Sequence, residues 1–186
     1  MRPSVPKMLP AGPDDFLVQA KYDGWNTVVF EGHVWTRRGN DITSWCHDWG
    51  FDLAPQSPVN GELLAEADGE PGERTDIPGI RTGRCLPRVV AFDLMLEGPP
   101  IEERLASLLE LTCGRMEPAP TTDPEQTDAT WKDINLLYEE ARARGHEGLL
   151  LKRKRSPYHT SRETSIVTAD WLKLRVPAQL STETSP

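Results

Sequence analysis

The sequence has few cysteines, and their arrangement excludes two classes of small protein. Cys46, Cys85 and Cys113 stand far apart in 186 residues, and no CxxC pair occurs. A zinc knuckle needs ligands at close spacing, and a disulfide framework needs an even set of cysteines. We therefore expect neither.

Long apolar runs are also missing. No stretch approaches the roughly 20 apolar residues that a membrane helix requires. Residues 1–10 contain no apolar stretch of the kind found in a secretory signal. These features predict a cytoplasmic location and no membrane partner.

Positive charge is scarce. The chain carries 21 Lys and Arg against 29 Asp and Glu, a net charge of -8. This balance excludes a general nucleic-acid coat protein, because such proteins neutralise many phosphates. Nucleic-acid binding would need a local basic surface, and residues 147–176 offer one. That segment has seven Lys or Arg and three Asp or Glu, a net charge of +4, whereas the rest carries -12. The alternative is a solvated charged turn.

Several common catalytic and nucleotide-binding motifs do not occur. The chain has no GxxxxGK[ST] loop and no GxGxxG after a strand, so P-loop and Rossmann nucleotide binding lack support. GxSxG and HExxH are absent as well.

What is present is a series of short apolar segments that predict strands. Glu31-Gly32 predicts a tight hairpin turn, and other short connections favour antiparallel pairing. The fold class predicted is α+β, with antiparallel β-sheets flanked by helices around one compact core. The expected strands are 16–20, 25–30, 33–36, 59–65, 89–96, 148–152 and 171–174.

Helical spacing predicts two packing helices. They cover residues 101–112 and 131–141, and Gly145 is expected to follow the second helix as its C′ residue. A weaker third helix is expected within 44–53. Residues 67–87 predict a mobile loop, 118–128 a linker, and 177–186 a disordered tail after a single domain of residues 1–176.

Lys21-Tyr22-Asp23-Gly24 is the motif most indicative of chemistry. It places a lysine at a strand–turn junction, where the backbone holds it. An amine is a nucleophile only when unprotonated, and neighbouring cations and partial burial favour that form. Lys152, Lys173 and Arg175 are available cations. Taken alone, the motif is a weak signal, and a surface lysine in a hairpin turn is the commoner explanation.

Other predicted strands also carry a charge beside apolar neighbours. Glu62, Asp93 and Lys152 do so, and the alternation of 171–175 places Lys173 and Arg175 on one face. Several such strands in a small domain suggest that these charges converge on a polyanion.

Taken in order, these motifs resemble those of the covalent nucleotidyltransferases. The closest resemblance is to the adenylation domain of ATP-dependent DNA ligases, over roughly residues 7–175, and RNA ligases and mRNA capping enzymes share the superfamily. The matching motifs are Lys21-Tyr-Asp-Gly, Thr36-Arg37, Asn60-Gly-Glu62, Phe92-Asp93, Glu147-Gly-Leu-Leu-Leu-Lys152 and Trp171-Leu-Lys173-Leu-Arg175.

The resemblance implies a ligase-type nucleotidyltransferase (ATP-grasp-like) domain without an OB-fold domain. It implies that Lys21 attacks ATP to form lysyl-AMP, and that AMP then passes to the 5′-phosphate of nicked double-stranded DNA. It further implies that Phe92 stacks on adenine, Gln19 contacts adenine and Glu62 holds the ribose. A magnesium or manganese ion would be bound by Glu147 and Glu62, and nucleotide phosphates by Arg37, Lys152, Lys173 and Arg175.

Three positions depart from the family pattern. Asn26 stands where an arginine is usual, Asn60 where an aspartate is commoner, and Arg175 where a lysine is usual. With no OB-fold in the chain, it would be a minimal ligase, a fragment, or an enzyme helped by a separate DNA-binding subunit or domain in trans. The alternatives left open are an RNA ligase, a capping-type enzyme, and an inactive nucleotide-binding or partner-binding module.

Overall fold

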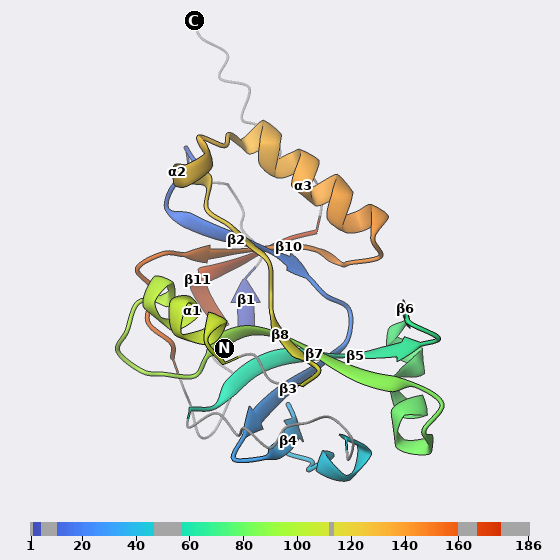
Figure 1. Ribbon diagram of the computed structural model, residues 1–186. Helices are drawn as coiled ribbons and strands as arrows, with labels where there is room; N and C mark the ends of the chain where they lie inside the picture. Colours follow the sequence, from blue (N-terminus) through green and yellow to red (C-terminus); the bar gives the residue numbers. More distant parts are fainter. Residues whose placement is uncertain (1, 5–10, 47–56, 112–113, 160–166, 176–186) are drawn as a thin grey trace, which may run out of the picture. The chain divides into compact units, whose positions relative to one another are not determined.

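A computed structural model describes residues 2–4, 11–46, 57–111, 114–159 and 167–175. Within these residues, eleven strands form two sheets, and helices accompany each sheet (Figure 1). The elements are β1 (Arg2–Ser4), β2 (Phe16–Lys21), β3 (Trp25–Phe30), β4 (His33–Thr36), η1 (Thr43–Cys46), β5 (Val59–Ala67), β6 (Glu70–Pro71), η2 (Arg74–Thr82), β7 (Leu86–Leu94), α1 (Ile101–Leu109), β8 (Met116–Pro118), β9 (Thr121–Thr122), α2 (Pro124–Thr127), α3 (Trp131–Ala143), β10 (Gly148–Arg153) and β11 (Val167–Leu174).

The chain divides into two compact units. The first unit comprises Met1–Tyr22, Pro120–Ser156 and Ser161–Pro186, and the second comprises Asp23–Ala119 and Pro157–Thr160. Each has its own hydrophobic core. The expectation of one compact core is therefore wrong, because the buried apolar residues form two separate clusters.

The first unit is a five-stranded sheet in the order β1-β11-β10-β2-β9. Helix α3 lies along one face (Figure 1) and buries a stripe at helical spacing. Ile134 of α3 and Leu151 of β10 have no exposed surface, and each such residue contributes about 1.5–3 kcal/mol to folding. Gly145 follows α3 with a φ of +82°, as its place at C′ predicts.

The second unit contains a six-stranded sheet, with β4-β3-β5-β7-β8 in order and β6 paired to β5. Glu31 and Gly32 have φ values of 49° and 76°, so the β3–β4 hairpin turns with two left-handed residues, as expected. The core includes Val59, Leu63 and Val89 on one sheet face, and Leu108 of α1 packs against it.

The α+β fold class is confirmed, but three local predictions are wrong. Residues 67–87 are not a loop, because η2 buries Ile77 and Ile80 in the second core. Residues 118–128 are more than a linker, since they contain β9 and α2. Pairing is not wholly antiparallel: β1 runs parallel to β11 and β8 runs parallel to β7.

Some predictions fall partly or wholly outside the described residues. The weak helix at 44–53 coincides with η1 only at its start, and Thr112 of the first helix and the tail 177–186 are not described. No OB-fold is present in the described part of the chain. None of the described helices is long and apolar enough to cross a membrane.

Candidate active site around Lys21

Lys21 ends β2 and forms an ion pair with Glu147. Its Nζ lies 2.7 Å from Glu147 Oε2, and both side chains are about one-fifth exposed. The backbone N–H of Glu147 also donates to the Lys21 carbonyl at 2.7 Å. Because both the main chain and the side chain make the contact, the carboxylate is fixed beside the amine.

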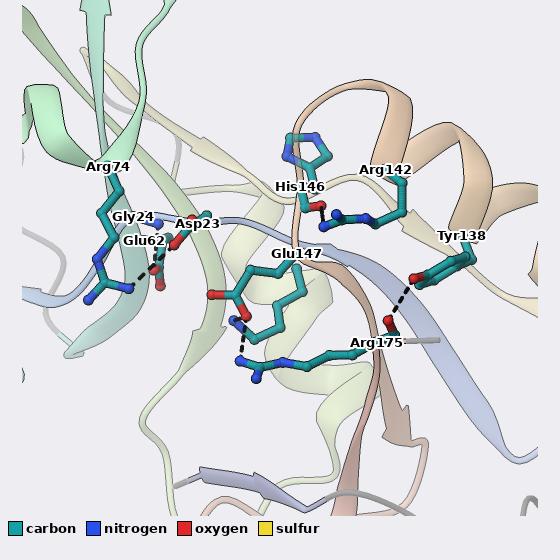
Figure 2. A network of polar contacts seen from close by, with 10 residues as sticks. Asp23, Gly24, Glu62, Arg74, Tyr138, Arg142, His146, Glu147 and Arg175 are labelled. Atoms are coloured by element: carbon teal, nitrogen blue, oxygen red, sulfur yellow. Dashed lines mark hydrogen bonds and ion pairs between the residues drawn. The ribbon is translucent and has the colours of Figure 1, made fainter. Parts of the chain in front are cut away.

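Arg175 contacts the same carboxylate oxygen. Its Nη2 lies 2.6 Å from Glu147 Oε2 (Figure 2), and the Tyr138 hydroxyl donates to the Arg175 carbonyl at 2.6 Å. Partial burial favours the neutral carboxyl, but the hydrogen bonds and charges of Lys21 and then Arg175 outweigh it. The pKa of Glu147 is consequently held below its ordinary value, and the group is a carboxylate near neutral pH.

Gly148 allows these strands to meet. It lies opposite Lys21 in the β2–β10 register and has a φ of +140°. A Cβ at this position would come within 2.1 Å of the Leu174 carbonyl oxygen. Only glycine fits such an approach, so Gly148 helps bring Lys21, Glu147 and Arg175 together.

The sheet register places the other predicted residues of the first unit on the face that carries Lys21. Gln19 is two residues before Lys21, Leu150 lies opposite Gln19, and Lys173 lies opposite Leu150. Lys152 follows Leu150 by two positions. Since successive side chains alternate, all of these lie on the face opposite the one covered by α3.

Lys152 and Gln19 are buried polar residues on this face. Lys152 has no exposed surface, and its Nζ lies 4.3 Å from the centroid of the Trp171 ring. This distance permits a cation–π interaction. Gln19 is 1% exposed and donates to Thr121 Oγ1. Lys21 therefore differs from a lysine in an ordinary surface turn, because it lies among polar groups that the sheet orients.

The remaining predicted residues, Arg37, Glu62 and Phe92, lie in the second unit. Glu62 Oε1 accepts a hydrogen bond from the Gly24 backbone N–H at 3.1 Å (Figure 2). A Cβ on Gly24 would come within 2.3 Å of the Leu63 carbonyl oxygen. The glycine of the lysine motif is thus required by the close approach of β5.

Phe92 is placed by an irregularity in β7. The β5–β7 register passes from Asn60–Asp93 to Gly61–Ala91 and leaves Phe92 as an extra residue. Such a bulge redirects a side chain relative to regular alternation. Arg37 follows β4, and its backbone N–H donates to the Asn26 carbonyl at 3.0 Å.

Two departures from the family pattern are hydrogen-bonded to each other. Asn26 Nδ2 donates to Asn60 Oδ1 at 2.9 Å, and Asn60 Nδ2 donates to the Tyr158 hydroxyl at 2.8 Å. Burial raises the pKa of Tyr158, so its hydroxyl stays neutral. The motifs pointed to Asn26 and Asn60 but not to their connection, because strand register cannot be read from separate motifs.

Asp93 corrects the expectation that every strand charge serves a polyanion. It has no exposed surface and accepts hydrogen bonds from Arg104 Nε at 2.8 Å and Nη2 at 3.0 Å. Arg104 is equally buried, and Tyr158 lies beneath its guanidinium. The Asp93 charge is therefore paired with Arg104 in the interior of the second unit.

The basic segment 147–176 is also more neutral than its composition indicates. Lys154 Nζ lies 2.5 Å from Asp123 Oδ1 and 2.7 Å from Glu125 Oε2. Arg153 lies near Asp15 and Asp170. Much of the expected basic surface is therefore paired with carboxylates, which the sequence segment alone could not reveal.

The described residues contain no group of three or more His, Cys, Asp or Glu side chains that could hold a metal ion. Glu147 is a hard oxygen ligand of the kind that magnesium prefers, but it supplies a single carboxylate. This set suits a metal ion that arrives with nucleotide phosphates and not one caged by protein ligands.

Part of the sequence is similar to that of a known DNA ligase, although no protein-family profile matches it. A probable DNA ligase of Anaeromyxobacter sp. (strain Fw109-5) is 32% identical over 129 residues, which cover 63% of this chain. The chain spans only about a quarter (24%) of that relative.

Solved structures of DNA ligases resemble the chain over most of its length. A Lig E DNA ligase matches 94% of this chain and 68% of its own, with a TM-score of 0.63 and 18% identity. The fold is that of a ligase nucleotidyltransferase domain. Mycobacterial DNA ligase D complexed with ATP and MES matches 92% of this chain and 59% of its own, with a TM-score of 0.61 and 18% identity. The Chlorella virus DNA ligase-adenylate matches 86% and 63%, with a TM-score of 0.60 and 15% identity.

The ligase resemblance inferred from the ordered motifs is thus confirmed for the fold. Of the predicted site residues, the ligase-fold sheet of the first unit brings together Lys21, Glu147 and Arg175 by direct contact. Their catalytic and binding roles, and those of the residues in the second unit, stay predictions.

Proposed function

We propose that this chain is the nucleotidyltransferase part of an ATP-dependent DNA ligase and that Lys21 is its nucleophile. The supporting observation is the cluster of Lys21, Glu147 and Arg175 at the end of a sheet face that also carries Lys152 and Lys173. The relatives are DNA ligases, and one was crystallised with ATP.

In the proposed reaction, the Lys21 amine loses a proton and attacks the α-phosphorus of ATP. The Nζ–phosphorus bond forms, the bond to the β-phosphate bridge breaks, and pyrophosphate leaves. AMP then passes from Lys21 to the 5′-phosphate of nicked DNA. The 3′-hydroxyl displaces AMP and joins the strand.

The cations on this face suit the charge that develops on phosphate oxygens. Lys152 and Lys173 come from two adjacent strands, and Arg175 directly follows the second, so the sheet holds these cations before the nucleotide arrives. Fixed charges of this kind stabilise a transition state without the cost of reorganising solvent. In the second unit, Glu62 would hold the ribose, Phe92 would stack on adenine and Arg37 would bind phosphate.

A divalent ion would supply charge neutralisation at the nucleotide phosphates. Glu147 is the carboxylate available to it in the first unit, and Glu62 is the proposed carboxylate of the second. Since Lys21 and Arg175 both use Oε2 of Glu147, the other oxygen of that carboxylate is the one that neither of these cations contacts.

The Lys21–Glu147 ion pair represents the resting state of the nucleophile. An ammonium group has no lone pair and cannot attack phosphorus. We therefore infer that the pair must open or transfer its proton when ATP binds.

The test is covalent labelling of the full chain. Incubation with ATP and magnesium or manganese should add one AMP, measured by intact mass, and Lys21→Arg should abolish the adduct. Lys132→Arg, which changes an exposed lysine on α3, should label normally. Absence of an adduct under all these conditions would contradict the proposal.

Strand sealing distinguishes the substrates. Nicked DNA and nicked RNA are offered to the labelled chain, alone and with a separate DNA-binding domain. We expect AMP transfer to the DNA 5′-phosphate. Transfer of AMP to RNA alone would contradict the proposal that DNA is the substrate, but it would still support nucleotidyltransferase activity.

A further inference from the structure

The C-terminal half of α3 is hydrogen-bonded to two segments that hold Glu147. The Tyr138 hydroxyl donates to the Arg175 carbonyl at 2.6 Å (Figure 2). Arg142 Nη1 donates to the His146 carbonyl at 2.7 Å. Arg175 pairs with the Glu147 carboxylate, and His146 immediately precedes Glu147 in the chain. The helix is therefore connected to Glu147 twice: to its carboxylate through Arg175 and to its main chain through His146.

Tyr138 has the more firmly held side chain of the two donors. It is 6% exposed and belongs to the hydrophobic core of the first unit, whereas Arg142 is exposed. Its ring also packs against Gly148, because a Cβ built on that glycine would lie 3.2 Å from Tyr138 Cε2. Gly148 lies opposite Lys21 in the β2–β10 register. The hydroxyl thus projects from a ring that core packing fixes beside the strand pair carrying Lys21.

The Tyr138 hydrogen bond holds Arg175 just beyond the paired part of its strand. The register of β10 with β11 ends at the pair Leu149–Leu174, and β11 itself ends at Leu174. The hydrogen bond therefore fixes the backbone of Arg175 one residue after the sheet stops fixing it. Because the Arg175 side chain is 55% exposed, surrounding atoms restrain it only in part. The position of its backbone then decides how well the guanidinium reaches Glu147.

Arg175 becomes the remaining partner of Glu147 when Lys21 reacts. Both cations contact Oε2 of Glu147, and the Lys21 amine has to leave that oxygen to attack phosphorus. The carboxylate is only about one-fifth exposed, and a partly buried charge that loses its partner is destabilised. With Arg175 held in place, the carboxylate keeps a cation at the same oxygen, and the release of Lys21 requires less free energy.

We propose that Tyr138 is a positioning residue for nucleotidyl transfer. Its hydroxyl holds the Arg175 backbone, so that the guanidinium stays on the Glu147 carboxylate while the lysine is released. This inference rests on the proposed function, in which Lys21 reacts with a nucleoside triphosphate. It extends the site to α3, a helix that contains none of the ligase motifs and that the sequence predicts only as a packing element.

Single-turnover labelling of the full chain with ATP and magnesium tests the inference. Tyr138→Phe removes the hydroxyl and keeps the ring. The rate constant for labelling at saturating ATP should fall about three- to tenfold, as expected for the loss of one hydrogen bond. The fraction of chain finally labelled should equal that of the wild type. A purely structural defect would do the opposite, because it lowers the folded fraction without changing the rate constant of the folded molecules.

Ile134→Val is the matched control for stability. It removes one methylene group from the same helix and the same core, one turn before Tyr138. It should lower the urea midpoint at least as much as Tyr138→Phe does, yet it should be labelled at the wild-type rate.

Arg175→Gln tests the route by which Tyr138 acts. This change alters an exposed side chain and keeps the backbone carbonyl that accepts from Tyr138. It should slow labelling at least as much as Tyr138→Phe. Adding Tyr138→Phe to Arg175→Gln should slow labelling by less than about a further twofold, because two residues that act through one contact are not additive.

Each outcome decides for or against the inference. A wild-type rate constant in folded Tyr138→Phe overturns it, as does an equal loss of rate in Ile134→Val or additive losses in the double variant. If Tyr138→Phe does not fold, Arg175→Gln decides: slowed labelling supports the inference, and a wild-type rate overturns it. Labelling of wild-type Lys21 supports the proposed function in all of these cases, whereas its absence overturns both.

Discussion

Lys21 and Glu147 are 126 positions apart in the chain, yet they are joined by both a side-chain ion pair and a backbone hydrogen bond, each 2.7 Å long. The backbone hydrogen bond fixes the main chain of Glu147 beside Lys21, and the ion pair with Arg175 holds the carboxylate at the end of the Glu147 side chain. An amine and a carboxylate held in this way can be tested separately for their parts in catalysis and in stability.

Glu147→Gln removes the charge while preserving the shape of the side chain. We expect AMP labelling of Lys21 to slow by about 10²-fold, as when one electrostatic group of an active site is removed. Stability should fall by less than about 1 kcal/mol, because the pair is partly exposed. Single-turnover labelling and urea unfolding measure the two effects. Glu139→Gln, on the exposed side of α3, is the control, and a wild-type labelling rate in Glu147→Gln would contradict the prediction.

The same carboxylate predicts an acid dependence of stability. The pKa of Glu147 is lower in the folded protein than its ordinary value of 4.5, so the folded state favours the ionised form. Its stabilising contribution is complete above pH 4.5 and is lost as the pH falls through the lowered folded value. Urea midpoints between pH 3 and 7, a range of about four units around this titration, should decline less steeply in Glu147→Gln than in wild type. Equal slopes would show that the ion pair does not couple to folding.

Gly148→Ala should damage the first unit. The added Cβ would lie 2.1 Å from the Leu174 carbonyl oxygen, and the φ of +140° is unfavourable for alanine. We expect a loss of about 3 kcal/mol or more in unfolding free energy, together with loss of labelling. Gly145→Ala is the matched control: its φ is +82°, but the added methyl group would meet no atom within 4 Å, so the cost should be about 1 kcal/mol. A similar cost for both variants would exclude the steric explanation.

Asp93 and Arg104 test the buried ion pair of the second unit. Asp93→Asn should cost about 3–5 kcal/mol, because it leaves a fully buried guanidinium without its charge partner. The double variant Asp93→Leu/Arg104→Met should cost less than the single change. Arg74→Gln, which breaks the exposed pair with Asp23, should cost less than about 1 kcal/mol. Thermal and urea unfolding measure the free energy of unfolding of each variant. A loss below about 1 kcal/mol in Asp93→Asn would contradict the prediction that Arg104 depends on the buried charge of Asp93.

The pairing of Lys154 predicts which basic residues matter for DNA. Lys154→Gln should change the affinity for nicked DNA by less than about twofold, because its charge is already balanced by Asp123 and Glu125. Lys173 makes no ion pair with any described residue, and Lys173→Gln should reduce the salt dependence of binding by about one unit of slope. Fluorescence anisotropy at several salt concentrations measures both. The reverse ranking would place the DNA on another surface.

The sequence predicted the strands that have strong local patterns. β2, β3, β5, β7, β10 and β11 each contain enough apolar or alternating residues to be recognised, and α1 and α3 show clear helical stripes. By contrast, β1, β8 and β9 are two or three residues long and exist because a neighbouring strand pairs with them. Such edge strands have too few residues for a periodic signal.

The candidate site was predicted as a set of residues and not as a set of contacts. Motif order identified Lys21, Glu147 and Arg175, but their shared carboxylate oxygen depends on tertiary pairing. Thr121 had no local signal at all, because its relation to Gln19 arises from register. Likewise, the sequence could not show whether Asp93 faces solvent or is buried, because its buried partner Arg104 is known only from the structure.

The alternation of β2 also constrains how this strand can evolve. If one residue were inserted or deleted between Phe16 and Gln19, the strand residues before that point would switch to the opposite face of the sheet, relative to Lys21. Phe16, which now packs beneath α3, would be turned toward the side that carries Lys21, and Leu17 would be turned toward α3. Insertions or deletions in this segment should therefore be tolerated only when they change its length by an even number of residues. The turn that follows Lys21 has no alternating faces and is not subject to this restriction.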